Sequence, residues 1–297
     1  MLAREALLKA ADLIRQGRLV AFPTETVYGL GANALDERAV RKIFEAKGRP
    51  MTSPLIVHVD SVAMARSLVT DWPSGAEALA KLWWPGPLSI ILPKRPSIPD
   101  VVTAGLPTVA LRMPAHPVAL ALIAAAGVPI AAPSANRFTE LSPTTAGHVR
   151  RSLGGRVAMI LDGGPCQVGI ESTVISLAGP RPVLLRPGMI HQRELEEVLG
   201  PFGEYRLDGE AHPSPGMHER HYSPRTPLHL LPLEKSGRGA SLRLAVMPRD
   251  PAGYAAALYG KLHQLDEEGW EWIAVEPPPA TPEWAGVLDR LRRAASG

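Results

Sequence analysis

Short apolar segments alternate with amphipathic helical segments over residues 1–200 of the chain. Residues 2–16 place apolar side chains at helical spacing, and Arg18–Phe22 then reads as a short buried strand. Asp36 and Gly48 bracket a second helix as its N-cap and its C-terminal stop. This alternation predicts a layered α/β architecture. Because several predicted strands follow one another without a helix between them, we expect a mixed sheet.

The same reasoning places the other elements of this part. Ser142-Pro143 is an N-cap followed by proline, which predicts a helix running to Leu153. Thr24–Gly31 reads as a loop. Further helices are predicted at 61–69, 75–82, 117–126 and 190–199. Further strands are predicted at 54–59, 88–92, 109–113, 128–132, 157–161, 172–177 and 182–186.

A change of composition near residue 200 predicts a second, smaller unit. Residues 201–227 are rich in proline and histidine and poor in aliphatic side chains, which is typical of a linker. After it, 228–297 carries predicted strands at 242–247 and 270–275 and helices that open at Asp250-Pro251 and Thr281-Pro282. We therefore expect a larger α/β domain over 1–200, a Pro-rich linker over 201–227 and a small C-terminal α/β domain over 228–297.

Charge and cysteine usage narrow the class of protein. The net charge of +3 and the pI near 9.1 are compatible with a phosphate-bearing partner but do not require one. Cys166 is the only cysteine, which excludes an intrachain disulfide and a cysteine metal cluster and fits a cytoplasmic protein. The longest apolar run, Val118–Ala132, is too short to span a bilayer, so we expect no membrane partner.

Lys47-Gly48-Arg49-Pro50 places two cations on one tight turn at the end of a predicted helix. Cations are favoured at a helix C-terminus by the helix dipole, and that explanation alone accounts for Lys47 and Arg49. A fixed pair of cations is also what a polyphosphate requires. The spacing leaves both interpretations open.

Polar side chains end several predicted strands. Thr24, His58, Arg112 and Ser134 all stand where an apolar run stops, and Asn136 follows on the same turn as Ser134. Each has an ordinary explanation, such as a capped turn for Ser134 and Asn136 or a packed histidine for His58. Ligand crevices form at strand ends in α/β sheets, so the set together predicts a binding site.

Two other patterns carry less weight. Gly29–Ala34 matches a loose dinucleotide-binding pattern, but six residues separate its first glycine from the preceding strand, which argues against a nicotinamide site. His212, His218 and His221 lie in Pro-rich surroundings without a carboxylate at ligand spacing. We therefore predict no protein-bound metal centre.

The motifs taken together resemble the YrdC-type threonylcarbamoyl-AMP synthases in their long, two-domain form. The resemblance runs in order through residues 8 to 200, and the linker segment 214–224 is similar as well. The motifs that carry it are Phe22–Gly31, Lys47–Pro50, Pro54–Val59, Trp84–Pro87, Leu111–Pro114, Pro133–Asn136 and Leu185–Gly188. The resemblance implies a twisted mixed sheet with flanking helices.

The resemblance also implies an activity and its residues. The family joins L-threonine, bicarbonate and ATP, with Mg²⁺, into threonylcarbamoyl-adenylate and pyrophosphate. Lys47, Arg49, Ser134 and Asn136 would be catalytic. Threonine would be held by Thr26, His58, Arg112 and Ser172, with Arg112 on its carboxylate. ATP would be bound by Lys47, Arg49, Ser53, Thr108, Ser134, Asn136, Ser142, Arg186 and Tyr222, the last reaching back from the linker.

The resemblance also implies partners for the protein, and two alternative functions stay open. A separate complex would transfer the threonylcarbamoyl group to adenosine 37 of tRNA, so contact with that complex or with tRNA is possible, in a monomer or a homodimer. The C-terminal domain, whose clearest motifs are Leu258-Tyr259 and Arg290–Arg293, receives no ligand. The main alternative is a non-catalytic protein that binds double-stranded RNA or tRNA. A nicotinamide-linked oxidoreductase is a further one.

Overall fold

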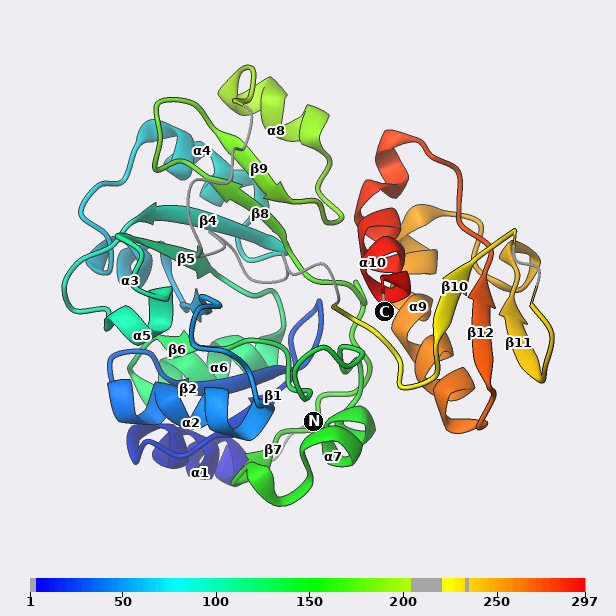
Figure 1. The fold of residues 1–297 in the computed structure, drawn as a ribbon. Coiled ribbons are helices and arrows are strands. Elements are labelled where there is room, and N and C mark those ends of the chain that lie inside the picture. Colours follow the sequence, from blue (N-terminus) through cyan, green and yellow to red (C-terminus); the bar gives the residue numbers. More distant parts are fainter. Residues whose placement is uncertain (1–3, 204–220, 233–234, 297) are drawn as a thin grey trace.

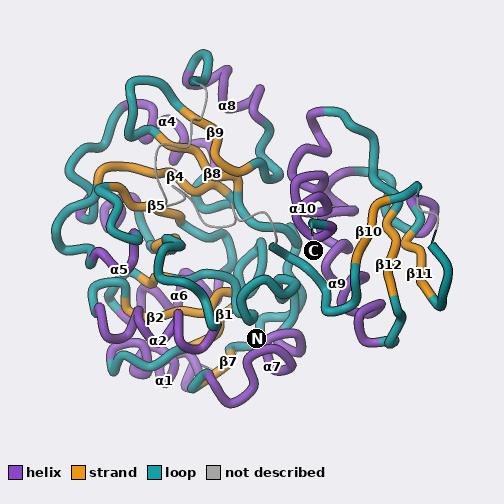
Figure 2. Tube along the Cα trace, in the orientation of Figure 1, coloured by secondary structure: helices purple, strands orange, loops and turns teal. Residues whose placement is uncertain are grey.

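Two sheets of unequal size organise the protein (Figure 1). The computed structural model describes residues 4–203, 221–232 and 235–296. Within them, nine strands form a large sheet and three form a small one. Figure 2 shows the helices and strands of the larger unit joined by many short loops, as its proline and glycine content suggests.

The large sheet is mixed, as predicted. Its order is β7-β1-β2-β6-β3-β5-β4-β8-β9, with parallel pairing at β7/β1, β3/β5 and β4/β8 and antiparallel pairing elsewhere. The strands are β1 (Val20–Phe22), β2 (Gly29–Asn33), β3 (Ile56–His58), β4 (Leu88–Pro93), β5 (Thr108–Arg112), β6 (Ile130–Ala131), β7 (Met159–Ile160), β8 (Thr173–Ser176) and β9 (Val183–Arg186).

Helices bury the apolar side chains of this sheet. In β1, Val20 and Phe22 pack with α1 and α6, whereas Ala21 faces a separate core that includes α2, as the two-residue period of a strand requires. The helical segments are α1 (Arg4–Arg15), α2 (Glu37–Lys47), α3 (Val62–Ser67), α4 (Ser74–Trp83), α5 (Asp100–Thr103), α6 (Pro117–Ala126), α7 (Ala146–Leu153), the 3₁₀ turn η1 (Gly154–Arg156) and α8 (Gln192–Leu199).

Helix α2 begins and ends as its sequence predicts. The Asp36 carboxylate accepts hydrogen bonds from the backbone N–H groups of Arg38 and Ala39. At the other end Gly48 has φ of 65°, the left-handed conformation that glycine adopts without strain. The turn at Gly48 therefore sends Lys47 and Arg49 into the protein, where both side chains are buried.

The C-terminal unit is a three-stranded parallel sheet with helices. Its order is β10-β12-β11, and both neighbours of β12 run parallel to it. Its elements are β10 (Leu228–Leu230), β11 (Gly239–Leu242), η2 (Leu244–Val246), α9 (Pro251–Glu267), β12 (Trp272–Val275), η3 (Pro282–Trp284) and α10 (Ala285–Ala295). The Asp250 side chain caps α9, confirming the predicted start there.

Helices α9 and α10 lie on the side of the small sheet that faces the larger unit (Figure 1). The apolar core of the C-terminal unit includes Val27, Leu141 and Ile170 from the larger unit. The contact is close: a Cβ added at Gly169 would come within 2.4 Å of the Ala255 carbonyl oxygen in α9. The two units therefore share a continuous packed interface.

Three local predictions were wrong. Residues 29–31 are not loop but part of β2, because pairing with β1 outweighs the low strand preference of glycine. Ser142 does not cap a helix: its hydroxyl bonds Glu171 instead, and α7 begins at Ala146 behind the capping Thr145. The strand predicted at 242–247 lies earlier, at β11, and β10 was not predicted.

Candidate active site

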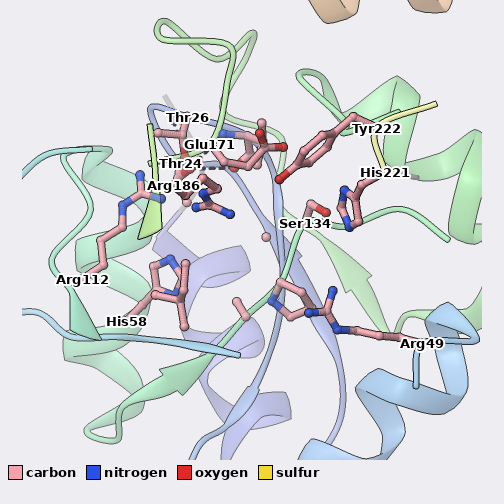
Figure 3. A pocket seen from close by; sticks show the side chains of 15 residues that line it. Thr24, Thr26, Arg49, His58, Arg112, Ser134, Glu171, Arg186, His221 and Tyr222 are labelled. Atoms are coloured by element: carbon pink, nitrogen blue, oxygen red, sulfur yellow. Dashed lines mark hydrogen bonds between the residues drawn. The ribbon is translucent and has the colours of Figure 1, made fainter. Parts of the chain in front are cut away.

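A small cavity lies among the strand ends of the large sheet, where the sequence predicted a crevice (Figure 3). Its volume is about 50 Å³. The residues that line it are Thr24, Thr26, Val27, Gly29, Arg49, Ile56, His58, Arg112, Ala132, Pro133, Ser134, Glu171, Arg186, His221 and Tyr222. The four strand-end residues singled out in the sequence, Thr24, His58, Arg112 and Ser134, are thus brought together.

The pairing of β3 with β5 brings His58 and Arg112 together. The two strands run in parallel with His58 opposite Arg112, so both side chains emerge at the same end of the sheet. Burial, followed by the neighbouring positive charge of Arg112, lowers the pKa of His58 to about 3. His58 is therefore neutral near pH 7, and its Nδ1 has no hydrogen-bond partner among the described residues.

Arg112 is paired with a carboxylate of the protein. Its Nη2 lies 2.7 Å from Oε1 of Glu25, and both side chains are buried. Arg112 Nε also donates a hydrogen bond of 3.3 Å to the Gly86 carbonyl. Its guanidinium plane is thus fixed from two sides. Next to Glu25, the Thr24 and Thr26 hydroxyls bond each other at 2.9 Å.

Arg186 and Ser172 hold each other at the ends of β8 and β9. Arg186 Nε donates to the Ser172 carbonyl at 3.0 Å, and its Nη2 donates to the Ser172 hydroxyl at 3.1 Å. The Ser172 hydroxyl also lies 2.8 Å from that of Ser89. Burial lowers the pKa of Arg186 below its ordinary value. Arg186 lines the cavity and Ser172 stands behind it.

Lys47 supports the turn that carries Ser134 and Asn136. Its ammonium donates to the Ser134 carbonyl at 2.6 Å and to the Asn136 carbonyl. Burial, and then the charge of Arg49, lowers the pKa of Lys47 well below its ordinary value. Two of its three N–H groups are therefore used on backbone carbonyls, and Lys47 does not itself line the cavity.

Arg49 lines the opposite side of the cavity from Arg112 (Figure 3). Its Nη2 donates to the Pro54 carbonyl at 3.1 Å, and its guanidinium lies 5.9 Å from the ring centre of Phe138. Burial lowers the pKa of Arg49 to about 10. Its Nε is buried without a hydrogen-bond partner among the described residues, so it has a donor to offer a ligand.

Tyr222 and His221 close the cavity from the linker side (Figure 3). Tyr222 is buried at φ of 60°, and its ring contacts that of His221 with centroids 4.0 Å apart. The Tyr222 hydroxyl is buried without a hydrogen-bond partner among the described residues. The histidines His212 and His218 lie outside the described residues.

Several of the predicted residues do not line the cavity. Asn136 and Ser142 are buried next to it, with Asn136 Nδ2 donating to Arg137 and Glu140 carbonyls and the Ser142 hydroxyl donating to Glu171. Ser53 is buried too. Thr108 starts β5, four residues before Arg112, so the structure places it toward the other end of that strand.

Sequence reasoning missed two buried carboxylates, Glu25 and Glu171. Glu171 accepts hydrogen bonds from the Ser142 hydroxyl at 2.5 Å, the Tyr259 hydroxyl at 3.2 Å and Arg290 Nε at 2.7 Å. Glu25 lies within the motif Phe22–Gly31, and Glu171 directly precedes Ser172, which the resemblance assigns to threonine; these positions are the signals that could have found them. Their charges partly balance the three guanidinium groups around the cavity.

No protein-bound metal centre is evident in the described part of the chain. Within it, no group of three or more histidine, cysteine or acidic side chains is placed to hold an ion. Burial raises the pKa of Cys166 to about 12, so this thiol is not a ready nucleophile. The arrangement therefore suits binding of anions by fixed guanidinium groups and hydrogen bonds.

Fold and site together define an α/β enzyme of the YrdC type, with a cavity lined by three arginines at its strand ends. The family model described as "Telomere recombination" (Sua5, YciO and YrdC) matches residues 12–188. A second model, described as "Threonylcarbamoyl-AMP synthase, C-terminal domain", matches residues 190–296. The chain belongs to the threonylcarbamoyl-AMP synthase family, in its two-domain form.

Named relatives support this assignment over the whole chain. Threonylcarbamoyl-AMP synthase of Bacillus subtilis is 44% identical, covering 98% of this chain and 93% of the relative. That of Pyrococcus abyssi is 53% identical over 72% of this chain and 64% of the relative. The crystal structure of P. abyssi Sua5 complexed with L-threonine superposes with a TM-score of 0.92, at 40% identity, covering 97% of this chain and 94% of that one.

The comparisons bear out the enzymatic interpretation and remove the alternatives. A non-catalytic RNA-binding protein does not fit the family, whose named members are synthases. The nicotinamide alternative fails because Gly29 and Gly31 lie within a paired strand instead of a phosphate-binding turn. No helix in the described residues is long and apolar enough to cross a membrane.

Proposed function

We propose that the cavity binds L-threonine at its Arg112 side and the phosphates of ATP at its Arg49 side. The observation that carries this proposal is the convergence of Arg49, Arg112 and Arg186 on one small cavity. Three buried guanidinium groups with only two nearby carboxylates favour anionic ligands. A carboxylate and a polyphosphate supply the missing negative charge.

The reaction needs positioning more than a covalent nucleophile. The threonine amine attacks the carbon of bicarbonate, and water leaves to give N-carboxythreonine. An oxygen of this carbamate then attacks the α-phosphorus of ATP, and the bond to pyrophosphate breaks. The products are threonylcarbamoyl-adenylate and pyrophosphate. Both reactants are anions, so fixed cations lower the barrier by offsetting their repulsion.

Threonine is assigned to the Arg112 side of the cavity. Arg112 would bind its carboxylate, while Thr26 and neutral His58 would bond its polar groups. Ser172 would support the threonine site by orienting Arg186, whose guanidinium donates to both the carbonyl and the hydroxyl of Ser172. In support, the P. abyssi Sua5 structure that superposes on this chain is a complex with L-threonine.

ATP is assigned to the Arg49 side. Arg49 and Arg186 would contact its phosphates, with Ser134 beside them, and Tyr222 would cover the nucleotide. Lys47 would act mainly by holding the turn of Ser134 and Asn136, with one N–H group left for a phosphate. Ser53, Thr108 and Ser142 stay predicted ATP residues, and Ser142 contacts the cavity wall through Glu171.

Mg²⁺ is proposed to enter on the ATP phosphates. The two carboxylates near the cavity are already used: Glu25 by Arg112, and Glu171 by Ser142, Tyr259 and Arg290. Mg²⁺ commonly keeps several waters and binds through substrate phosphates. Bound there it would share the charge that develops as pyrophosphate leaves.

The cavity must enlarge to admit these ligands. Its volume of about 50 Å³ is several-fold below the roughly 300–1,000 Å³ of a typical small-molecule site. Tyr222 and His221 are the lining residues that come from the linker, so their withdrawal is the simplest way to open it. We propose that they then close over bound ATP. In this proposal the chain divides into a catalytic domain over 1–200, a linker over 201–227 that carries both residues, and a C-terminal domain over 228–297.

The product points to its next reaction. A carbamoyl-adenylate is an activated mixed anhydride that must be passed to an acceptor before water hydrolyses it. We propose that a separate transfer complex moves the threonylcarbamoyl group to adenosine 37 of tRNA, and that the reaction takes place in the cytoplasm. We propose that the protein acts as a monomer or a homodimer.

Mass spectrometry tests the proposal directly. The purified protein is incubated with ATP, Mg²⁺ and ¹³C-bicarbonate, with and without L-threonine. We expect a threonine-dependent, labelled adenylate and an equal amount of pyrophosphate. Unconsumed ATP and no adduct over a range of pH and metal concentration would reject the proposed reaction.

A further inference from the structure

The C-terminal domain reaches the active site through one buried arginine. Resting on the proposed function, we infer that Arg290 of α10 is a positioning residue, which holds Ser172 and Arg186 in place through the residues next to them. The Arg290 side chain is fully buried. Its guanidinium bonds the larger unit at three points, and its Nη1 also lies 2.7 Å from the Asp289 carboxylate on its own helix.

The first contact is with the Glu171 carboxylate. Arg290 Nε lies 2.7 Å from Glu171 Oε2, and Tyr259 of α9 donates to the same oxygen at 3.2 Å. Ser142 donates to the other oxygen at 2.5 Å. Burial alone would raise the pKa of Glu171, but Arg290, Arg186 and the Ser142 bond outweigh it and hold that pKa below its usual value.

A carboxylate with three such partners is an anchor and not a general base. Glu171 lines the cavity, yet its oxygens already accept hydrogen bonds from Ser142, Tyr259 and Arg290. Two of these three partners come from the C-terminal domain. Glu171 therefore ties the wall of the cavity to α9 and α10.

The other two contacts are with backbone carbonyls. Arg290 Nη2 donates to the Glu171 carbonyl at 3.1 Å, and Nη1 donates to the Pro187 carbonyl at 2.9 Å. Glu171 and Pro187 directly adjoin Ser172 and Arg186 in the chain. One planar guanidinium thus fixes the spacing of the two segments whose side chains bond each other at the cavity.

Close packing makes this spacing sensitive to α10. A Cβ added at Gly286 of α10 would come within 2.6 Å of the Gly188 carbonyl oxygen, and one at Gly188 would come within 2.5 Å of the Thr173 nitrogen. The guanidinium of Arg290 also lies 5.3 Å from the ring centre of Tyr222. A shift of α10 is therefore passed to the cavity wall, since packed interiors do not absorb it.

The test compares Arg290→Met with Arg292→Met on the same helix. Met keeps the length of the side chain and removes its hydrogen bonds, and Arg292 is exposed. At a temperature where circular dichroism shows both variants folded, R290M should lose threonine affinity and kcat/KM by roughly 10²-fold, the scale of small misplacements in active sites. R292M should match the wild type.

Two further variants separate positioning from stability. Arg290→Lys keeps the charge opposite Glu171 but cannot span both carbonyls, so its kcat/KM should fall between wild type and R290M. Glu171→Gln together with Arg290→Met removes the uncompensated charge; it should recover melting temperature but not threonine affinity. A lower melting temperature for R290M with wild-type affinity and kcat would overturn the inference.

Hydrogen exchange provides a readout that does not depend on turnover. Amides of residues 170–174 and 185–189 should exchange faster in folded R290M than in wild type or R292M. If the wild type makes no adduct, the proposed function fails while this comparison still decides the inference. Unchanged exchange in R290M would overturn it, whatever the activity of the wild type.

Discussion

Glu25 Oε1 and Arg112 Nη2 face each other at 2.7 Å in the wall of the cavity, and both side chains are buried. The cation proposed to bind the threonine carboxylate is thus held by a carboxylate of the protein. Arg112 has a further acceptor in the Gly86 carbonyl, so its orientation is set before any ligand arrives. Such preorganisation reduces the entropy that binding must overcome.

The first prediction concerns Arg112→Met. Loss of a charged hydrogen-bond donor should weaken L-threonine binding by roughly 10–100-fold and leave ATP binding unchanged. Isothermal titration with each substrate measures both affinities. Threonine affinity equal to that of the wild type would remove Arg112 from the carboxylate site.

Stability provides the control for that variant. Removing Arg112 alone leaves Glu25 buried and unpaired, which should destabilise the fold by about 3–5 kcal/mol. Glu25→Gln together with Arg112→Met removes both charges and should recover much of this loss. Threonine affinity should stay low in the double variant, because the binding defect comes from the missing guanidinium and not from instability.

The second prediction concerns Arg49. Arg49→Met should lower adenylate formation by roughly 10²-fold or more, as for single electrostatic groups in other active sites. Arg41→Met is the matched control on the neighbouring helix α2, where Arg41 forms an exposed ion pair with Glu37. That pair contributes little to stability, so R41M should keep wild-type turnover. Equal rates for R49M and R41M would contradict a phosphate role for Arg49.

The third prediction is a pH dependence of stability that comes from His58. The pKa of His58 is about 3 in the folded protein, below the ordinary histidine value of 6.5. Between pH 3 and pH 6.5 this imidazole is therefore protonated in the unfolded chain more than in the folded protein. Stability should therefore fall as the pH drops below 6.5, by up to about 1.4 kcal/mol per pH unit from this group. Urea unfolding from pH 7 to pH 5 should show a shallower fall for His58→Asn. Parallel curves would contradict it.

Local signals in the sequence were enough for much of the fold. Asp36 and Gly48 bound α2 as predicted, because capping depends on a few adjacent residues. Ser142 misled for the opposite reason: its hydroxyl bonds Glu171, 29 residues away. In β2, pairing with β1 decided the structure of Gly29 and Gly31, which have little strand preference of their own.

The candidate site also has one part that could be predicted from the sequence and one part that could not. Thr24, His58, Arg112 and Ser134 could be grouped from sequence, because strand ends of one sheet meet at one edge. The Glu171–Arg290 pair could not, since its members are 119 residues apart and belong to different domains. Arg290 lies in the segment Arg290–Arg293 that the sequence analysis singled out, but only packing of α10 against the larger unit brings it into contact with Glu171.

The fourth prediction concerns Mg²⁺. Because both carboxylates near the cavity are engaged by the protein, Mg²⁺ alone should leave the melting temperature of the ligand-free protein unchanged. Mg²⁺ with ATP should raise it above the value with ATP alone, since only the folded state binds the complex. EDTA should stop adenylate formation without weakening threonine binding. Stabilisation by Mg²⁺ alone would point to a site on the protein.

The fifth prediction compares two buried tyrosines. The hydroxyl groups of Tyr222 and Tyr254 are both buried without a hydrogen-bond partner among the described residues, but only Tyr222 lines the cavity. A buried hydroxyl left unpaired costs about 1–3 kcal/mol. Tyr222→Phe and Tyr254→Phe should therefore each be as stable as the ligand-free wild type, or more stable.

Activity should separate the same two variants. If the Tyr222 hydroxyl finds its partner on the bound nucleotide, Y222F should raise KM for ATP, whereas Y254F should keep wild-type kinetics. Burial raises the pKa of both hydroxyls, so each is a neutral donor at pH 7. The two variants therefore differ in whether the hydroxyl that is lost lines the cavity. Thermal melts and steady-state rates on the two variants measure it. Identical kinetics for Y222F and Y254F would leave Tyr222 as packing alone, because a hydroxyl kept unpaired for ligand binding must affect affinity when it is removed.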